Sequence, residues 1–293
     1  MKKLTIVVAT DSHYTILLAA LLKSIEETVR KGQLLDVYVI DDHISKSAKA
    51  KLQRSVDSAL TTLTFKSVDE IIPQGINLPI DKSSYPLTIY LRLFIPSFIP
   101  KEVEKVLYLD VDMIVRKDIT TLFETDLGDN IVAAVQDPRI LTFDNSWGGV
   151  KNHKELGIAG DTHYFNSGLL LMDANKWRNL QIAEKTVECI NDNQKYVNYP
   201  DQYGLNVVLA NKWFELDGRW NYFSCFDTEE PFLIHYTGRK PIYKTYDNNP
   251  LFLEIFNKHL SQTAWKNLKP IGESRRYIKK IRNILEKIIK KLR

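Results

Sequence analysis

Two aspartates that follow a short apolar strand are the clearest chemical feature of this sequence. Val106–Leu109 is a β-prone apolar run, and Asp110 and Asp112 come directly after it. Because residues two apart in an extended segment point the same way, the two carboxylates are expected to converge at the carboxyl end of the strand. A divalent cation such as Mg²⁺ or Mn²⁺ would relieve their repulsion and could also hold the phosphates of a nucleotide. The alternative is a turn in which both aspartates face water.

A later segment contains the other residue types that such a site would use. Residues 234–243 read IHYTGRKPIY, so His235 follows a short apolar strand and precedes Gly238, Arg239 and Lys240. An imidazole can serve as a metal ligand, and the cationic side chains can pair with a diphosphate. A lone histidine is more often a structural or surface residue. His235 is therefore a candidate metal ligand only in combination with Asp110 and Asp112.

The elements that must position these residues begin with alternating strands and helices. Strands are predicted at Leu4–Ala9, Asp36–Ile40 and Leu63–Val68, and helices at residues 16–29 and 45–60, the second capped by Ser45. This alternation predicts an α/β fold with a mainly parallel sheet and helices on both faces. Ligands of such sheets bind beyond the carboxyl ends of the strands, so the loop at residues 10–14 should share a crevice with Asp110 and Asp112.

That loop lacks the glycines of the common nucleotide-binding motifs. No GxGxxG or GxxxxGK[ST] occurs in the chain, which argues against a Rossmann oxidoreductase and a P-loop NTPase. Asp11 could accept hydrogen bonds from a base edge and Tyr14 could stack on it. A capping aspartate and a packed tyrosine explain the same two residues without a ligand.

The middle of the chain places polar residues beside apolar elements. A helix is predicted at Leu87–Phe98, ended by Pro96, and Arg92 inside it needs a carboxylate or a ligand oxygen as its partner. A strand at Ile131–Val135 leads to Asp137. Residues 139–163 then form a long loop, which we interpret as a lid or an acceptor-side surface.

Three further elements complete this region. They are a strand at 164–173 and helices at 177–191 and 199–210. In the strand, Asn166 and Ser167 precede a glycine, and these small residues would let a ligand approach the backbone. Asp201 and Gln202 lie in the first turn of the last helix, where an acid also suits the helix dipole.

Composition indicates a globular protein with a charged tail. The chain has 293 residues, of which 44% are hydrophobic. Residues 273–293 carry a net charge of +7 within a total of +4, so the other residues carry −3. From Tyr277 to Leu292, apolar residues recur at three- and four-residue steps, which predicts a basic amphipathic helix. This helix could lie on an anionic membrane surface or dock on protein.

Other compositional features bear on location and partners. The body lacks a basic stripe with interleaved aromatic residues, so no nucleic-acid partner is expected. Two cysteines give no disulfide framework, which fits a reducing compartment. The apolar run after MKKL stops at Asp11, so it predicts a strand in place of a signal peptide, and no run approaches the roughly 18 apolar residues of a membrane span. We expect a cytoplasmic protein that could be peripheral at the inner face of the cell membrane.

Taken together, these segments resemble the family 8 retaining glycosyltransferases, a group that includes bacterial lipooligosaccharide α-galactosyltransferases and glycogenin. The matching stretches are ATDSHY (9–14), YLRL (90–93), YLDVD (108–112), Asp137, YFNSGLLLMD (164–173), PDQYGLN (200–206) and HYTGRKP (235–241). They occur in the family's order and span about residues 1–245. Each motif is modest alone, but seven in order are specific.

The resemblance implies a fold and a set of site residues. It implies a GT-A type, Rossmann-like catalytic domain over residues 1–260, with a mainly parallel mixed sheet flanked by helices, and a basic amphipathic tail at 261–293.

The resemblance also assigns roles to single residues. By motif, Asp110, Asp112 and His235 match ligands of Mn²⁺ (or Mg²⁺). Ala9, Thr10, Asp11 and Tyr14 match the uridine pocket, Val111 also matches donor binding, and Gly238 and Lys240 match the diphosphate clamp. Arg92, Asn166, Ser167, Asp201 and Gln202 match donor-sugar contacts, and Asp137 matches a residue beside the reacting centre.

The sequence departs from the family pattern at two places. Lys240 follows Gly238 by only two residues and Ile242 replaces the family's Trp, so both Arg239 and Lys240 are candidates for the diphosphate clamp. His13 stands where a small polar residue such as Asn is common.

The implied activity is metal-dependent transfer of galactose or glucose from a UDP-sugar, with retention, to a saccharide acceptor on lipid or protein. Gln202 is poorly nucleophilic, which favours front-face attack over a covalent intermediate on Asp201. One alternative is a catalytically silent module that binds UDP-sugar or glycan. Another is an Asp-x-Asp phosphohydrolase, but Ile114 stands where that class normally has Thr or Val.

Overall fold

The structure is a computed structural model that describes residues 3–80, 85–227 and 230–292. The chain forms two compact units, and each is made of separate stretches of sequence. The first unit comprises residues 1–68, 106–126 and 217–273, and the second comprises 69–105, 127–216 and 274–293.

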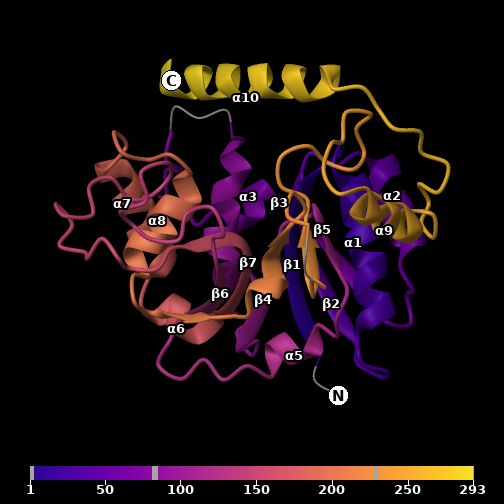
Figure 1. Cartoon of the computed structure of the whole chain (residues 1–293), viewed down its shortest axis with the longest axis horizontal. Helices are drawn as coiled ribbons and strands as arrows, with labels where there is room; N and C mark the ends of the chain where they lie inside the picture. The colour runs from indigo at the N-terminus through magenta and orange to yellow at the C-terminus, as the bar shows by residue number, and fades with distance from the viewer. Residues whose placement is uncertain (1–2, 81–84, 228–229, 293) are drawn as a thin grey trace. The chain divides into compact units, whose positions relative to one another are not determined.

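The first unit contains parallel strands in the order β3-β2-β1-β4. The strands are β1 (Leu4–Asp11), β2 (Leu35–Asp42), β3 (Thr61–Ser67) and β4 (Lys105–Leu109). Helix α1 (Thr15–Thr28) packs against both α2 (Lys46–Ser55) and α9 (Pro250–Leu260), and a short α5 (Thr120–Phe123) follows strand β5 (Met113–Val115). Figure 1 shows these helices beside the strands of the unit. The predicted strand–helix alternation is confirmed.

A small second sheet in the first unit positions the histidine. Strand β5 (Met113–Val115) runs antiparallel to β10 (Leu233–His235), which pairs with β9 (Tyr222–Phe223) after the 3₁₀ helix η2 (Gly218–Asn221). His235 pairs with Met113 in the register. The segment 105–115 is therefore two strands, because β4 ends before Asp110 and β5 begins after Asp112.

The second unit contains β7 (Phe165–Asp173), which runs antiparallel to β6 (Val132–Gln136), and β8 (Trp213–Glu215), which runs parallel to β6. Its helices are η1 (Leu87–Phe94), α4 (Ile95–Phe98), α6 (Ala174–Asn179), α7 (Ile182–Asp192), α8 (Pro200–Val208) and α10 (Ser274–Leu292), and α3 (Val68–Ile71) begins at the boundary of the units. The strands of the first unit's larger sheet are parallel and those of the second unit are mixed, and helices flank both, so the predicted α/β class with a mainly parallel mixed sheet is confirmed.

Three helices of the structure differ from the predicted helices in their bounds or type. The helix after Ser45 ends at Ser55 and not at Leu60, because Asp57 forms a turn by accepting the Ala59 amide at 2.9 Å. Residues 87–94 form a 3₁₀ helix, and Pro96 lies at the start of α4 instead of ending a helix, since a first-turn proline loses no intrahelical hydrogen bond. The helix predicted at 177–191 is two helices, α6 and α7, separated where Gln181 adopts a left-handed φ of 54°.

The predicted long loop between β6 and β7 is confirmed, and it is a packed segment. Its side chains Ile140, Phe143 and Val150 are buried with Tyr164 and Tyr203 in one apolar cluster. The loop backbone is therefore anchored by a small core of its own.

The predicted tail helix is also confirmed as α10. The exposed apolar side chains of this helix are Tyr277, Ile278, Ile281, Ile284, Leu285, Ile288 and Ile289. Asn283 and Lys287 are buried, whereas the side chains of residues 275, 276, 279, 286 and 290–293 lie outside the described part. No helix among the described residues is long and apolar enough to cross a membrane.

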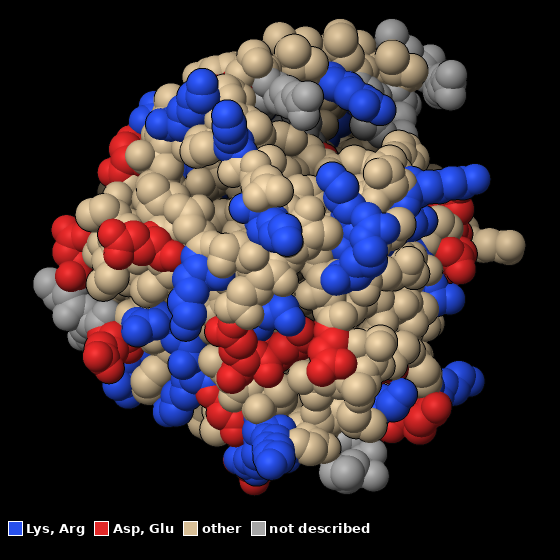
Figure 2. Space-filling view, turned by 90° about the vertical axis from the view of Figure 1, so that its right-hand side faces the viewer, with Lys and Arg blue, Asp and Glu red and all other residues tan. Residues whose placement is uncertain are grey.

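On the face of the molecule drawn in Figure 2, Lys and Arg side chains are interspersed with Asp and Glu, so this face carries both signs of charge.

Candidate functional site

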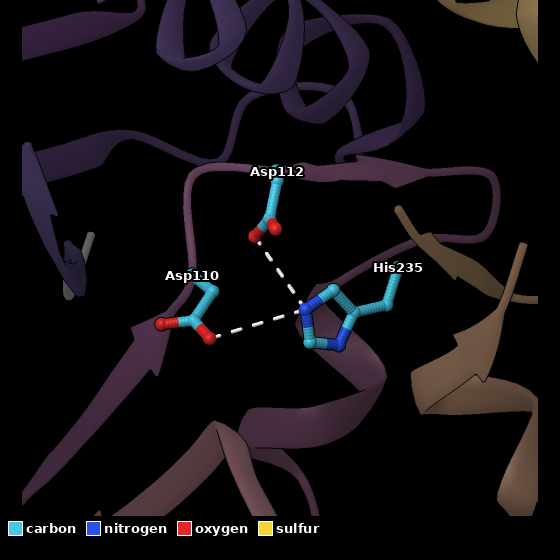
Figure 3. Close-up of side chains that lie close together, drawn as sticks. All are labelled: Asp110, Asp112 and His235. Carbon is cyan, nitrogen blue, oxygen red and sulfur yellow. Dashed lines mark ion pairs between the residues drawn. The ribbon is translucent and has the colours of Figure 1, made fainter. Parts of the chain in front are cut away.

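Asp110, Asp112 and His235 converge in the first unit (Figure 3). His235 Nε2 lies 3.9 Å from Asp110 Oδ2 and 3.5 Å from Asp112 Oδ1, and one ligand atom from each residue lies within 4.8 Å of the others. The bend between β4 and β5 and the β5–β10 pairing bring the three together. The predicted convergence of the carboxylates is confirmed, although two strands and not one extended segment achieve it.

Buried neighbours fix the orientation of two members of this trio. His235 Nδ1 lies 2.8 Å from Asn221 Oδ1, and Asn221 is itself buried. If Nδ1 carries the proton that this amide oxygen accepts, the lone pair of Nε2 points toward the carboxylates. On the other side, the buried Tyr108 donates its hydroxyl hydrogen to Asp110 Oδ1 at 2.6 Å.

The donor set fits a divalent cation. Two carboxylates and one neutral imidazole suit Mn²⁺ and, with more oxygen ligands, Mg²⁺. Among the described residues this is the group of three that could hold a metal ion. Its side chains are only 6% to 27% exposed, and burying two anions together is costly without a compensating cation.

Lys240 supplies part of that compensation. Its ammonium group forms an ion pair with Asp112 Oδ2 and donates to the Tyr236 carbonyl at 2.8 Å. Burial tends to raise the pKa of Asp112, but the charge of Lys240, together with the contact with His235, outweighs it and holds the pKa well below its ordinary value. Gly238 adopts a left-handed φ of 79°, a conformation that suits glycine, in the turn before Lys240.

Arg239 and Lys240 have different partners. The Arg239 guanidinium pairs with Asp247 at 2.5 Å and with Glu273 at 3.4 Å. Lys240 is therefore the basic residue that contacts the trio. Beside it, Thr237 keeps its hydroxyl oxygen buried without a hydrogen-bond partner among the described residues.

The loop after β1 lies near the trio within the first unit. Asp11 Oδ1 accepts the backbone N–H groups of His13 and Tyr14, each at 3.0 Å, so Asp11 forms a turn before α1. The N-cap residue of α1 is Tyr14, and α1 has no side-chain capping hydrogen bond, so Asp11 is not its cap. His13 Nε2 contacts the Tyr243 hydroxyl at 2.9 Å. Burial and the contact with Tyr243 raise the pKa of Tyr14 well above its ordinary value, and the charge of Asp112 adds to the effect. Ala9 and Thr10 end β1, and Val111 is buried between the aspartates.

A second cluster of predicted site residues lies in the second unit, where Arg92 is paired. Arg92 Nε lies 3.2 Å from Asp201 Oδ2, and Nη1 donates to the Ser167 carbonyl at 2.8 Å. Ser167 Oγ donates to the same Asp201 oxygen at 3.1 Å. The partner of Arg92 is therefore a carboxylate of α8, and the Asp201 charge is compensated.

Gln202 stands at the centre of the same cluster. Its Oε1 accepts from the Ser167 amide at 3.0 Å and from Asn166 Nδ2 at 3.1 Å, while its Nε2 donates to Asp137 Oδ2 at 3.3 Å. Asn166 Nδ2 also donates to Asp137 Oδ2 at 3.0 Å. Asp137 Oδ1 accepts two backbone N–H groups from the loop that follows β6. The cluster is a preorganised set of dipoles and charges.

Sequence reasoning missed three residues that support these clusters. Asn221 and Tyr108 orient the trio, and Asn206 bridges α8 and β7 through both the amide and the carbonyl of Phe165, at 2.8 and 2.9 Å. Asn206 was visible in the PDQYGLN motif. Nothing in the local sequence connects Asn221 to His235, because that contact arises from the pairing of β9 and β10.

The family model of Glycosyl transferase family 8 matches residues 5–241. General stress protein A of Bacillus subtilis is 26% identical over 287 residues, covering 90% of this chain and 95% of that protein. The lipopolysaccharide glucosyltransferase WaaO of Escherichia coli is 30% identical over 235 residues, covering 70% of this chain and 68% of that protein. Several streptococcal relatives are longer, and the chain spans between 22% and 58% of their length.

Among solved structures, the galactosyltransferase LgtC in complex with donor and acceptor sugar analogues superposes with a TM-score of 0.71 at 25% identity. The match covers 93% of this chain and 99% of that one. This similarity confirms the predicted GT-A type of fold.

Proposed function

Because the chain belongs to glycosyl transferase family 8, we propose that it is a metal-dependent retaining transferase that moves galactose or glucose from a UDP-sugar to a saccharide acceptor. The observation that carries the proposal is the trio of Asp110, Asp112 and His235, with Nε2 turned toward the carboxylates by Asn221. Family membership supports a glycosyltransferase, and the donor set supports the metal.

The residues of the first unit take the nucleotide part of the donor. Asp110, Asp112 and His235 would hold Mn²⁺ or Mg²⁺, which supplies positive charge to the diphosphate of the leaving UDP. Lys240 adds a cation, and Thr237 has a buried hydroxyl that can donate to a phosphate oxygen. Asp11 and Tyr14, with Ala9, Thr10 and Val111, form the uridine side of the site. Gly238 allows the turn that carries Lys240.

The residues of the second unit hold the transferred sugar. Arg92, Asn166 and Ser167 fix the positions of Asp201 and Gln202, and Asp137 lies within hydrogen-bond reach of Gln202. Asp201 is paired with Arg92, which lowers its nucleophilicity, and an amide is a poor nucleophile. We therefore favour front-face attack by the acceptor hydroxyl, in which Gln202 stabilises positive charge on the sugar through its carbonyl oxygen.

Release of UDP from UDP-glucose, UDP-galactose and UDP-N-acetylglucosamine, with Mn²⁺ or with EDTA and no acceptor, tests this proposal. We expect slow, metal-dependent release confined to glucose or galactose. UDP binding without turnover of any donor would indicate a silent binding module, and hydrolysis of p-nitrophenyl phosphate would indicate a phosphohydrolase. Either outcome contradicts the transferase.

We also propose that the tail at 261–293 attaches the protein to an anionic membrane surface at the cytoplasmic face, where a lipid-linked saccharide would be the acceptor. The specific observation is that seven large apolar side chains of α10 are 43% to 64% exposed. Residues 273–293 of the tail carry a net charge of +7, and a basic residue near an anionic membrane contributes about 1 kcal/mol. The name of the WaaO relative, a lipopolysaccharide glucosyltransferase, supports a lipid-linked acceptor.

Vesicle sedimentation tests this attachment. Deletion of residues 272–293, and separately Ile281→Glu with Ile288→Glu, should abolish binding to phosphatidylglycerol vesicles at low salt while UDP release continues. Phosphatidylcholine vesicles are the matched control, and we expect them to bind the full chain weakly. Equal binding by all variants would contradict the membrane role, and loss of thermal stability on deletion would indicate that α10 docks on protein.

A further inference from the structure

The loop between β6 and β7 presents an aromatic surface that the proposed roles above do not use. The Trp147 side chain is 60% exposed and that of Tyr85 is 42% exposed. Their ring centroids lie 6.1 Å and 6.3 Å from that of Tyr199, which joins them into one patch. A large aromatic ring exposed to water loses the favourable free energy that burial would give it. Contiguous exposed apolar surface often marks a binding site.

Trp147 is exposed on a turn that is firmly held. Asn145 Oδ1 accepts the backbone N–H groups of Trp147 and Gly148 at 3.1 and 3.3 Å. A Cβ added to Gly148 would lie 2.5 Å from Ile140 Cδ1 and 3.5 Å from Tyr199 Cε2, so the turn packs closely on both residues. A Cβ on Gly149 would collide with the carbonyl oxygen of Phe143. The exposed indole ring of Trp147 is therefore attached to a backbone turn that hydrogen bonds and close packing hold in place.

Tyr199 connects this surface to the sugar-binding cluster of the same unit. It is the N-cap residue of α8 and precedes Asp201 and Gln202 by two and three residues. Ile140, on which the Gly148 turn packs together with Tyr199, donates its backbone N–H to Asp137 Oδ1 at 3.1 Å. Burial raises the pKa of Tyr199, and the negative charge of Asp137 raises it further. The aromatic surface therefore adjoins the residues to which we assign the reacting sugar.

We propose that Tyr85, Trp147 and Tyr199 form the acceptor subsite, and that a pyranose ring of the acceptor saccharide packs its apolar C–H face on the Trp147 indole. A sugar ring combines a flat C–H face with a rim of hydroxyl groups, so it suits an aromatic surface with polar groups at its edge. The hydroxyl groups of Tyr85 and Tyr199 provide polar atoms on that surface. The inference rests on the proposed function, because it takes the reacting sugar to lie beside Asp137 and Gln202.

Glycoside binding in the absence of donor tests the subsite directly. Saturation-transfer NMR is recorded with methyl α- and β-glucosides, methyl α- and β-galactosides and lactose. The proteins are the full-length chain, Trp147→Ala, Trp147→Phe and Phe214→Ala. Phe214, an exposed aromatic of β8, is the matched control. We expect at least one glycoside to bind the full chain, Trp147→Ala to weaken it about tenfold or more, and Trp147→Phe and Phe214→Ala to bind nearly normally.

Acceptor-free UDP release separates this inference from the proposed function. Trp147→Ala should release UDP within about twofold of the full chain and raise the KM of the acceptor in transfer assays, because of the two substrates the ring would contact the acceptor and not the donor. Equal glycoside binding by Trp147→Ala and the full chain, or no glycoside binding at all, would overturn the subsite. Competition by octanol as effective as by glycosides would also overturn it, since the surface would then take hydrocarbon. Failure of UDP release in the full chain would instead overturn the proposed function.

Discussion

The two polar clusters of this protein are built on opposite principles. In the first unit, Asp110, Asp112 and His235 bring acceptor atoms together, and the positive charge nearby comes from Lys240 on one side. In the second unit, Arg92, Asp137, Ser167, Asp201 and Gln202 satisfy one another through direct hydrogen bonds and an ion pair. Under the proposed function, a cation from solution would complete the first cluster, whereas the second is complete as folded. Removing a residue from the first should therefore affect activity alone, and removing one from the second should also affect stability.

The largest expected effect is on the trio. Asp110→Ala or Asp112→Ala should abolish transfer, a loss beyond the ~10²- to 10³-fold typical of one stabilising group, because each removes a metal ligand. Mn²⁺ binding by calorimetry and UDP release measure the effect, and circular dichroism should show an intact fold. Asp129→Ala, at an exposed position, is the control. Full activity in either variant at buffered Mn²⁺ would remove the metal from the mechanism.

A smaller loss is expected at the centre of the second cluster. Gln202→Ala should reduce turnover about 10²- to 10³-fold while the configuration of the product is retained, since the amide only stabilises the transition state. Product NMR gives the anomeric configuration, and mass spectrometry detects any adduct. A sugar covalently trapped on Asp201 would replace front-face attack with a double displacement.

The stability contrast is tested at the buried ion pair. Arg92→Met leaves the Asp201 carboxylate buried without its cation, so it should lower the free energy of unfolding by about 3 kcal/mol. Arg92→Met combined with Asp201→Leu should recover much of that loss, because both charges are gone. Urea denaturation measures both, and Asp110→Ala serves as the comparison that should lose little. Equal destabilisation by Arg92→Met and Asp110→Ala would end the distinction between the clusters.

The sequence predicted the fold class and the convergence of Asp110 and Asp112 because those signals are local, whereas His235 was joined to them only by the family resemblance. Strand and helix periodicity located β1, β2, β3, α1 and α10, and the apolar run before Asp110 marked the end of β4. Pairings between distant segments were not accessible. The partner of Arg92 is 109 residues away, and Asn221 reaches His235 only through the small sheet. The break between α6 and α7 depends on a single left-handed residue, Gln181, which is not a residue type that predicts such a conformation.

A change in the orientation of His235 should lower the affinity for Mn²⁺ more than it lowers the rate of sugar transfer at saturating Mn²⁺. Asn221→Ala removes the acceptor of Nδ1 and should weaken Mn²⁺ about 10- to 100-fold, the usual cost of losing an outer partner of a metal ligand. Asn221→Asp keeps an acceptor oxygen and should restore most of the affinity. Electron paramagnetic resonance of free Mn²⁺ measures both variants. Unchanged affinity in Asn221→Ala would return His235 to a structural role.

The smallest expected effect is at Thr237, whose buried hydroxyl oxygen has no hydrogen-bond partner among the described residues. Thr237→Val keeps the shape of the side chain and removes a polar group that folding leaves unsatisfied, so the free protein should gain about 1 kcal/mol in stability or stay unchanged. If the hydroxyl donates to the diphosphate, the same variant should raise the KM of the UDP-sugar by roughly five- to tenfold at saturating Mn²⁺, since one such hydrogen bond is worth about 1 to 1.5 kcal/mol.

Thermal unfolding with and without UDP separates the two effects, because in Thr237→Val only the increase in melting temperature caused by UDP should become smaller. Thr237→Ser, which retains the hydroxyl, is the matched control and should bind UDP normally. A variant that loses stability and keeps its affinity for UDP would show that the hydroxyl serves the fold, and the diphosphate would then depend on Lys240 and the metal trio alone.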